Sequence, residues 1–379
     1  MLEHRRLATM MLCMSTVLAI GCSGPESGAN KTPAKTNEDG RLLNLYIWSD
    51  YLAPDTIASF EKQTGIKVRV SYFDTNETLE SRVLTGSSGF DVVVPTAPFL
   101  QRQIRSGAYQ QLDKQQLPNY TNLDPQLMSQ VALNDPGNAH AIVYAWGTFG
   151  IGYNKKMVAA ALPTMAPDTW RLIFDPAVAA KLAACGISVL DEPTGVVRLV
   201  LNYLGKDPNE LNAQNLEQIE RVLIGIRPYV RNINSSSYIE ALANGDICVA
   251  LGYNGDVIQA RNRAHEANNG IQIEYAIPKE GSEVWFDTLA IPRDAPHPEN
   301  AHRFINYILN PRVIADISNF TGFANPNSAA TSLLKASIAS DPAVYPPPQQ
   351  RQRLFVQLED APERTRAITR LWQKFKTGQ

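Results

Sequence analysis

The sequence predicts an α/β protein with two domains, each built on a mostly parallel sheet flanked by helices. Short apolar runs alternate with helical stretches along the chain, which is the pattern of βαβ units. One run, Phe90–Pro95, is short, apolar and rich in β-branched residues, which is typical of a central strand buried on both faces. The chain has 379 residues, and the roughly 340 that follow an N-terminal leader exceed what one hydrophobic core usually contains.

The first 22 residues have the features of a secretory leader. Arg5 and Arg6 supply positive charge, and residues 7–20 form an apolar run that is shorter than the ~20 residues of a membrane span. The stretch Leu18–Cys22 resembles a bacterial lipobox, so Cys22 is the predicted lipidation site; an ordinary signal cleaved nearby is the alternative. Residues 23–41 are rich in Ser, Gly, Asn, Thr and Pro, and we expect a flexible tether. The protein is therefore expected outside the cytoplasm, held at a membrane surface.

Charge and motif content exclude several classes of function. The formal net charge is −2 and no Lys/Arg block occurs, which argues against nucleic acid as a partner. The five histidines form no HExxH or other tight ligand spacing, and neither GxxxxGK[ST] nor GxGxxG after a strand is found, so we predict no metal and no cofactor. Cys185 and Cys248 remain beyond the leader as an even pair in an oxidising compartment, which predicts a disulfide; two separate buried thiols are the alternative.

The elements that build the two domains follow from periodicity and from helix-ending residues. The expected strands are 45–51, 66–72, 90–95, 144–154, 185–190, 245–252 and 271–278. The expected helices are 54–65, 77–84, 99–106, 216–224, 236–243, 298–309, 312–317 and 363–376. The glycine-spaced strand 144–154 is expected to cross between the domains.

An acid stands beside aromatic residues at three element boundaries. These boundaries carry Asp50 after Trp48, Asp256 after Tyr253, and Asp287 after Trp285. Ligands of open α/β sheets bind outside the carboxyl ends of the strands. Carboxylates compensate the desolvation of an ammonium group, and ring faces attract cations and cover methylenes. The three boundaries together predict one cleft for a cation with an aliphatic body.

Longer stretches of the sequence carry a resemblance to a known family. They are Trp48–Tyr51, Ala53–Thr56, Phe60–Lys62, Thr64–Val68, Gly89–Asp91, Gly150–Asn154, Asn202–Pro208, Leu242–Cys248 and Ile277–Gly281. In these stretches, and from Leu43 to the C-terminus without large gaps, the chain resembles the periplasmic putrescine/spermidine-binding proteins of ABC transporters.

The resemblance implies a two-lobed periplasmic binding protein fold of type II, with the ligand cleft between the lobes. Residues 42–146 and 278–320 would form lobe 1, and 147–277 and 321–379 would form lobe 2. The implied function is an extracytoplasmic, monomeric subunit, not an enzyme, that captures a polyamine and delivers it to an ABC permease in the inner membrane.

Position by position, the resemblance also implies a set of ligand contacts. They fall on Trp48, Ser49, Asp50, Tyr51, Thr96, Tyr253, Asp256, Trp285, Asp287 and Phe323. The disulfide of relatives falls on Cys185 and Cys248. Where many relatives have a Glu facing an amine, this chain has Gly195, and Glu192 is the candidate to replace that carboxylate.

Three further positions depart from the family pattern. Tyr253 stands for a Trp, Phe323 for a Tyr and Thr96 for a Ser. The carboxylate absent at Gly195 weakens the case for a second ammonium, because a buried cation without an acceptor is costly.

Other functions remain open at this point. The altered site is also compatible with a different small amine or a zwitterion, and the same fold would serve an amine sensor. An enzyme that used Asp50, Asp256 and Asp287 as acid and base, as paired carboxylates act in glycosidases, is disfavoured because no nucleophile–His arrangement or metal set accompanies them.

Overall fold

The computed structural model describes residues 39–49 and 51–378. The predicted leader, Cys22, most of the predicted tether and Asp50 lie outside the described residues. Within the described ranges, no helix combines the length and the apolar character needed to cross a lipid bilayer.

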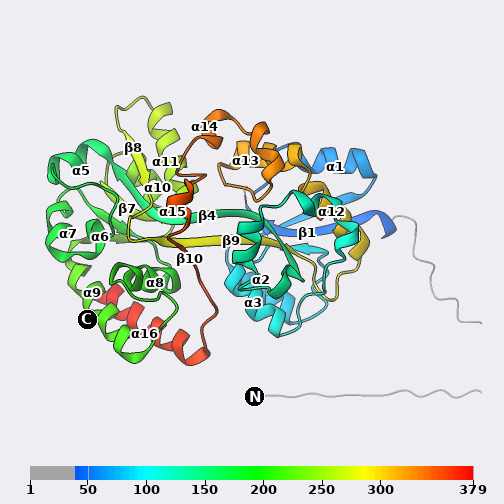
Figure 1. Cartoon of the computed structure of the whole chain (residues 1–379), viewed down its shortest axis with the longest axis horizontal. Helices are drawn as coiled ribbons and strands as arrows, with labels where there is room; N and C mark the ends of the chain where they lie inside the picture. The colour runs from blue at the N-terminus through cyan, green and yellow to red at the C-terminus, as the bar shows by residue number, and fades with distance from the viewer. Residues whose placement is uncertain (1–38, 50, 379) are drawn as a thin grey trace, which may run out of the picture.

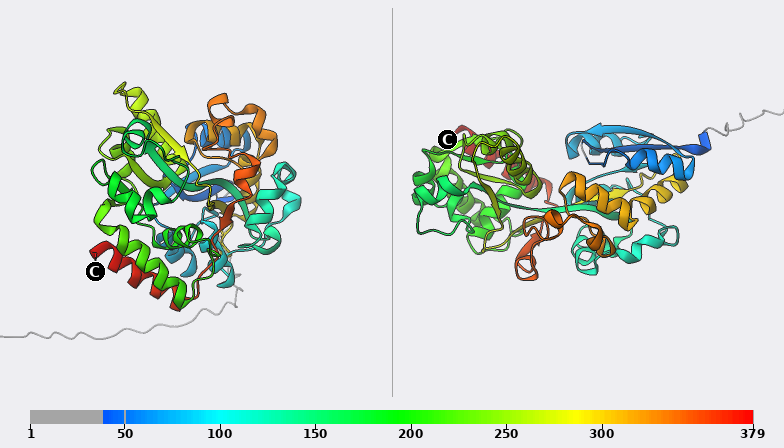
Figure 2. Two further views of the ribbon diagram at one scale, coloured as in Figure 1. Left: turned by 60° about the vertical axis from the view of Figure 1, so that its left-hand side comes forward. Right: turned by 90° about the horizontal axis from the view of Figure 1, so that it is seen from above.

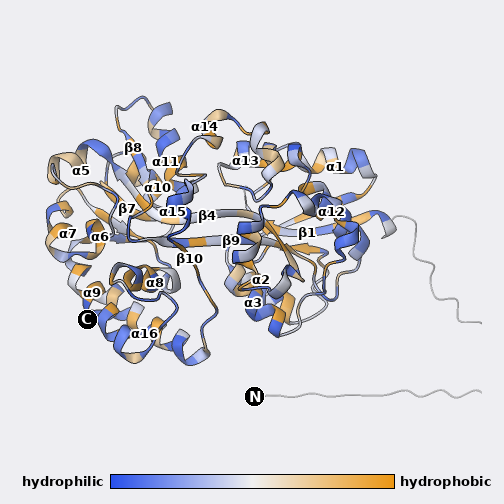
Figure 3. Ribbon diagram, in the orientation of Figure 1, coloured by the Kyte–Doolittle hydropathy of each residue, from blue (hydrophilic) through white to orange (hydrophobic). Residues whose placement is uncertain are grey.

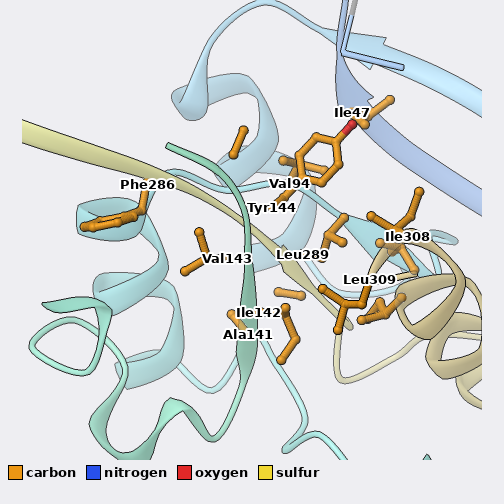
Figure 4. Packing of buried hydrophobic residues seen from close by; sticks show 14 of the residues in the cluster. Ile47, Val94, Ala141, Ile142, Val143, Tyr144, Phe286, Leu289, Ile308 and Leu309 are labelled. Carbon is orange, nitrogen blue, oxygen red and sulfur yellow. The ribbon is translucent and has the colours of Figure 1, made fainter. Parts of the chain in front are cut away.

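The first half of the molecule is a sheet with helices on both sides, shown at the right of Figure 1. Its elements up to the crossing strand are β1 (Leu42–Trp48), α1 (Thr56–Thr64), β2 (Lys67–Phe73), α2 (Asn76–Leu84), β3 (Val92–Val93), α3 (Ala97–Arg105) and α4 (Pro125–Val131). Strand β1 pairs in parallel with β2 and β3. Helices α12 (Pro298–Ile308) and α13 (Pro311–Thr321) return to this half, and Figure 4 shows Ile308 and Leu309 in its core.

The second half has the same kind of architecture. Its elements are α5 (Lys155–Ala161), α6 (Arg171–Phe174), α7 (Pro176–Leu182), β5 (Ile187–Val189), α8 (Pro193–Tyr203), α9 (Ala213–Ile226), β6 (Val230–Ile233), α10 (Tyr238–Ala243), β7 (Val249–Tyr253), α11 (Asn254–Glu266) and β8 (Ile273–Ala276). Strand β5 pairs in parallel with β6 and β7. In both halves the helices carry hydrophilic residues on their outer faces (Figure 3).

Two long antiparallel strands join the halves, β4 (Ala141–Asn154) and β9 (Ser282–Ala290). The first part of β4 pairs with β9, and its last residues pair with β7 and β8. Side chains of 141–146 lie in the first core, whereas Phe149 and Ile151 lie in the second. The sheet therefore runs in the order β2-β1-β3-β9-β4-β7-β5-β6, and Figure 2 shows the narrow connection between the halves.

The last part of the chain contacts both halves. It contains α14 (Ala336–Ala339), α15 (Pro348–Arg351), β10 (Leu354–Val356) and α16 (Pro362–Thr377). Ala324, Ala330 and Val344 belong to the first core, whereas Trp372 and Phe375 of α16 belong to the second. The two cores agree with a two-lobed fold, and the exact assignment of residues to lobes stays a prediction.

The expected start of helix α1 needs correction, whereas its expected end and the expected disulfide are confirmed. Helix α1 begins at Thr56, not at Pro54, because Ala53–Thr56 first form a turn in which the Thr56 N–H donates to the Ala53 carbonyl at 3.0 Å. Gly65 ends this helix in the left-handed conformation, as expected, at φ 71°. The predicted disulfide is present between Cys185 and Cys248, whose Cα atoms are 5.4 Å apart.

Candidate binding site

The ends of parallel strands bring most of the predicted site residues together. Trp48 ends β1 and Tyr253 ends β7. Thr96 follows β3 and is the N-cap of α3, and Glu192 follows β5 and is the N-cap of α8. The crossing strand β9 adds Trp285 and Asp287. Ligand-binding residues of α/β sheets are expected at such strand ends.

Asp287 is 4% exposed and is held by two hydroxyl donors from the first half. The Tyr51 hydroxyl donates to Asp287 Oδ2 at 2.8 Å, and the Thr96 hydroxyl donates to Oδ1 at 2.7 Å. Asn76 in turn fixes Thr96, donating to its Oγ1 at 2.9 Å and accepting from its backbone N–H at 3.1 Å. Asn76 was not predicted from the sequence, since its role depends on the approach of α2 to the end of β3.

Asp256 lies in the first turn of α11, where the helix dipole favours a negative charge. The Tyr238 hydroxyl donates to Asp256 Oδ2 at 2.8 Å and accepts from the Tyr253 backbone N–H at 3.1 Å. Tyr238 is fully buried and was also missed from the sequence. Burial raises the pKa of Asp256 to about 6, although its hydrogen bond opposes this shift. Burial likewise raises the pKa of Asp287 to about 6.

Aromatic rings lie beside these two carboxylates. Phe323 contacts Tyr51 and Trp285, with ring centroids 5.3 and 5.5 Å apart. Trp285 meets the Tyr253 ring at 6.4 Å, and Trp48 meets Tyr51 at the same distance. Phe323 packs against both hydrophobic cores, so the rings lie where the two halves of the molecule meet.

Gly255 allows the Phe323 ring to approach α11. A Cβ atom at this position would lie 2.2 Å from the Phe323 ring. Any larger residue would therefore displace the ring from the carboxylates. We name the set formed by Tyr51, Thr96, Tyr253, Asp256, Trp285, Asp287 and Phe323 the aromatic–carboxylate cluster.

The remaining predicted residues have different positions. Glu192 accepts a hydrogen bond from the Gly195 backbone N–H at 2.5 Å and another from the Thr194 hydroxyl. Burial raises the pKa of Glu192. Trp48 is half-buried and donates from Nε1 to the Val94 carbonyl at 3.0 Å. Ser49 is exposed, and Asp50 lies outside the described residues.

Cationic side chains compensate little of the negative charge of the cluster: the charge of Arg263 lowers the pKa of Asp256, but by less than burial raises it. Among the described residues, no Lys, Arg or His forms an ion pair with Asp256 or Asp287. Their hydrogen bonds come from neutral hydroxyl groups. Buried carboxylates beside aromatic faces suit a ligand with an ammonium group and an aliphatic body. The described part of the chain contains no group of three His, Cys, Asp or Glu residues suited to a metal ion.

The fold and the cluster define a two-lobed substrate-binding protein of the type II periplasmic class. Residues 55–346 match the sequence profile of the bacterial extracellular solute-binding proteins, and the chain belongs to this family. It is therefore an extracytoplasmic binding protein of the transport class and not an enzyme.

Individual relatives carry more specific names. The chain is 46% identical over 365 residues to the putrescine-binding periplasmic protein SpuD of Pseudomonas aeruginosa, covering 96% of this chain and 98% of that protein. It is 49% identical over 340 residues to the putrescine-binding periplasmic protein PotF of Escherichia coli, covering 89% and 92%. The structure resembles the spermidine/putrescine ABC transporter substrate-binding protein PotD of Streptococcus pneumoniae, with a TM-score of 0.79, 26% identity and coverage of 89% and 99%.

Proposed function

We propose that this protein is the solute-binding subunit of an ABC importer and that it captures putrescine or spermidine. The observation that carries the proposal is the pair Asp256 and Asp287. Asp287 is buried and Asp256 is half-buried, both have neutral hydrogen-bond donors, and both lie beside the rings of the aromatic–carboxylate cluster. The names of the relatives support the same ligand class.

In this function Asp256 and Asp287 receive an ammonium group, and the rings of Tyr51, Tyr253, Trp285 and Phe323 cover the aliphatic chain. Trp48, Ser49, Asp50, Thr96 and Glu192 complete the proposed contacts. A ligand that contacts both halves favours the form in which they are close together, because it can shift a conformational equilibrium only through differential binding. In that form the protein, as a monomer, would deliver its ligand to the inner-membrane permease.

Localisation at the membrane is part of the proposal. Lipidation of Cys22 would anchor the protein through the predicted tether, and mass spectrometry of the protein purified from membranes tests this. A diacylglyceryl Cys22 at the new N-terminus is expected. A water-soluble product cleaved elsewhere would contradict the anchor while leaving the binding function intact.

The experiment that tests the binding function is calorimetric titration of the purified, processed protein. Putrescine, spermidine, cadaverine, agmatine and γ-aminobutyrate would each be titrated in turn. Saturable binding of putrescine or spermidine is expected. A response only to agmatine or γ-aminobutyrate would favour the alternative of another amine or a zwitterion, for which the substitutions at Gly195, Tyr253 and Phe323 are the argument. No response to any of the five would overturn the proposal.

A further inference from the structure

Glu283 is a buried carboxylate that the predicted site does not include. It lies on β9 and is 3% exposed. Its Oε2 atom has no hydrogen-bond partner among the described residues. A buried carboxylate without a partner is costly, and such a group in a native protein calls for a specific explanation.

The position of Glu283 on β9 directs it toward the aromatic–carboxylate cluster. Alternate residues of a strand share one face, so Glu283, Trp285 and Asp287 lie on the same face of β9. Trp285 belongs to the second core, whereas its neighbours Val284 and Phe286 belong to the first. Four residues of strand span about 13 Å, which places the two carboxylates on either side of Trp285. The Trp285 Nε1 atom also lacks a hydrogen-bond partner in the described structure.

Gly195 on α8 leaves room for the Glu283 carboxylate. A Cβ atom at Gly195 would lie 2.6 Å from Glu192 Oε2, 3.0 Å from Phe149 Cζ and 3.2 Å from Glu283 Oε2. Two carboxylates and a ring edge therefore converge on the glycine. The Glu192 oxygens cap α8, whereas Glu283 Oε2 is unpartnered.

The charge of Arg198 acts on both Glu192 and Glu283, but most of its donors are used by other acceptors. It pairs with Asp360 at 2.7 Å and donates to the carbonyls of Thr194 and Leu358 at 2.9 and 3.0 Å. Glu192, Glu283 and Asp360 thus face a single guanidinium group. Burial, and then the charge of Glu192, raise the pKa of Glu283 to about 8, although Arg198 opposes this shift.

Tyr253 connects this group of acids to the cluster. Burial raises its pKa well above the ordinary value, and the charges of Glu192, Asp256, Glu283 and Asp287 raise it further. The phenol ring therefore lies within the electrostatic reach of all four carboxylates. The group around Glu283 and the pair Asp256 and Asp287 are two ends of one negatively charged region.

We propose that Glu283 receives the second ammonium group of the ligand, while Asp256 and Asp287 receive the first and Trp285 covers the chain between them. This inference rests on the proposed function and deepens it, because it makes the ligand an aliphatic diamine or polyamine rather than a monoamine. In relatives with a Glu at the position of Gly195, this carboxylate would come from α8. In this chain Glu283 would supply it from β9.

The test compares putrescine with butylamine, which has the same carbon chain and one ammonium group. Both are titrated calorimetrically at pH 7 into the wild type and Glu283→Gln, each in two buffers of different ionisation enthalpy, which gives the number of protons released on binding. Glu274→Gln is the matched control, because Glu274 is a half-buried acid on β8, which pairs with β4 and not with β9, and it already has an ion-pair partner in Lys155.

The expected results follow from the charge and from the protonation of Glu283. Removing one partner of a buried charge pair should weaken putrescine binding by about 30-fold or more, with less than about a threefold change for butylamine. Because the ammonium favours the ionised carboxylate, the wild type should release about one proton per putrescine, and Glu283→Gln should release far less. Glu274→Gln should behave as the wild type.

Several outcomes would overturn the inference. Unchanged putrescine affinity and proton release in Glu283→Gln would do so. The same losses in Glu192→Gln but not in Glu283→Gln would assign the ammonium to Glu192 instead. If Glu283→Gln fails to fold, the release of about one proton at pH 7 by Glu192→Gln still tests the proposal. This variant lacks the other acid of the group around Glu283 whose pKa is raised, and Asp256 and Asp287, with pKa values of about 6, are mostly ionised at that pH. A wild type that binds none of the amines would instead overturn the proposed function.

Discussion

At the scale of single residues, the site depends on buried acids whose partners are neutral. Hydroxyl groups orient Asp256 and Asp287, and neither acid has an ion-pair partner among the described residues. Such an arrangement is unfavourable in the empty protein and becomes favourable when a cation arrives. We therefore expect the carboxylates to determine the affinity for the proposed ligand, whereas the hydroxyl groups orient them and lower pKa values that burial has raised.

Replacement of Asp287 by Asn should weaken putrescine binding by about 30-fold or more, because an ammonium loses its buried counter-charge. The amide oxygen can accept one of the hydrogen bonds from Tyr51 and Thr96, and the amide NH2 can donate to the other hydroxyl group, so the fold should persist. Calorimetric titration measures the affinity, and Asp246→Asn, at an exposed position, is the control. Equal affinities of the two variants would contradict the role of Asp287.

Replacement of Tyr238 by Phe should have a smaller effect with a distinct pH signature. The hydrogen bond from Tyr238 lowers the pKa of Asp256, so its loss should raise that pKa above about 6 and weaken binding at pH 7 by about tenfold. Titrations from pH 5.5 to 8.5 should show the affinity recovering at higher pH, where Asp256 is ionised. A loss that is independent of pH would indicate a purely structural role.

At the scale of elements, helix and strand ends bring residues from distant parts of the chain to one place. The ends of β1, β3, β5 and β7 contribute residues from both halves, and β9 passes between them. Small residues allow the close approach of the elements, as Gly255 does for Phe323 and Gly195 for two carboxylates. The disulfide fixes the loop between α7 and β5 to the beginning of β7.

Replacement of Gly195 by Ala should have opposite effects on the stability of helix α8 and on putrescine affinity. Alanine stabilises a helix relative to glycine by about 1 kcal/mol, but its Cβ would lie 2.6 Å from the Glu192 carboxylate. We expect weaker putrescine binding and little loss of thermal stability, measured by titration and by calorimetric melting. Gly225→Ala in α9, where the nearest atom is a Pro176 carbon at 3.3 Å, is the control. Undiminished putrescine binding by Gly195→Ala would show that its carboxylate neighbours are not needed in their present positions.

Removal of the disulfide by replacing both Cys185 and Cys248 with Ala should lower the free energy of unfolding by about 2–5 kcal/mol, mainly through the unfolded state. Its sulfur atoms lie beside Leu182 and Gly186, away from the cluster. Putrescine affinity should therefore change little. Urea unfolding and titration of the same samples measure both quantities, and a large loss of affinity with intact stability would contradict this separation.

At the scale of the whole molecule, ligand binding and folding are linked through protons. The pKa values of Asp256 and Asp287 are raised to about 6 and that of Glu283 to about 8. An acid whose pKa is higher in the folded than in the unfolded protein stabilises the folded state. This contribution is complete below the ordinary pKa of the acid. This contribution is lost as the pH rises through the folded-state values, here from about 6 to about 8.

The increase in melting temperature produced by putrescine should therefore be larger at pH 8.5 than at pH 5.5. Above these pKa values the carboxylates are charged and costly without a ligand, whereas an alkylamine remains protonated until a pH of about 10. Calorimetric melting with and without a fixed excess of putrescine at both pH values tests this. An increase that is equal at both, or larger at pH 5.5, would contradict the linkage.

The sequence predicted the alternation of strands and helices, the crossing strand β4, the disulfide and the resemblance to a solute-binding family. These features depend on local periodicity or on long matching stretches, which are present in the sequence itself. Helices α8 and α11 were not predicted. Tyr253 both ends β7 and caps α11, so that strand end and helix start overlap in the pattern, and only three residues separate β5 from α8.

Only the tertiary structure decided which side chains meet. Tyr238 is distant in sequence from Asp256, to which it donates a hydrogen bond, and Asn76 reaches Asp287 only through Thr96. No local sequence pattern marks either residue. Strand β9 was not predicted, and Asp287, expected at an element boundary, lies inside it, so the alternation of Glu283, Trp285 and Asp287 on one strand appeared only in the structure. Its meaning depended on Gly195 and Arg198 of α8 packing against β9. Periodicity determines the face on which a residue lies, and the packing of distant elements determines what that face meets.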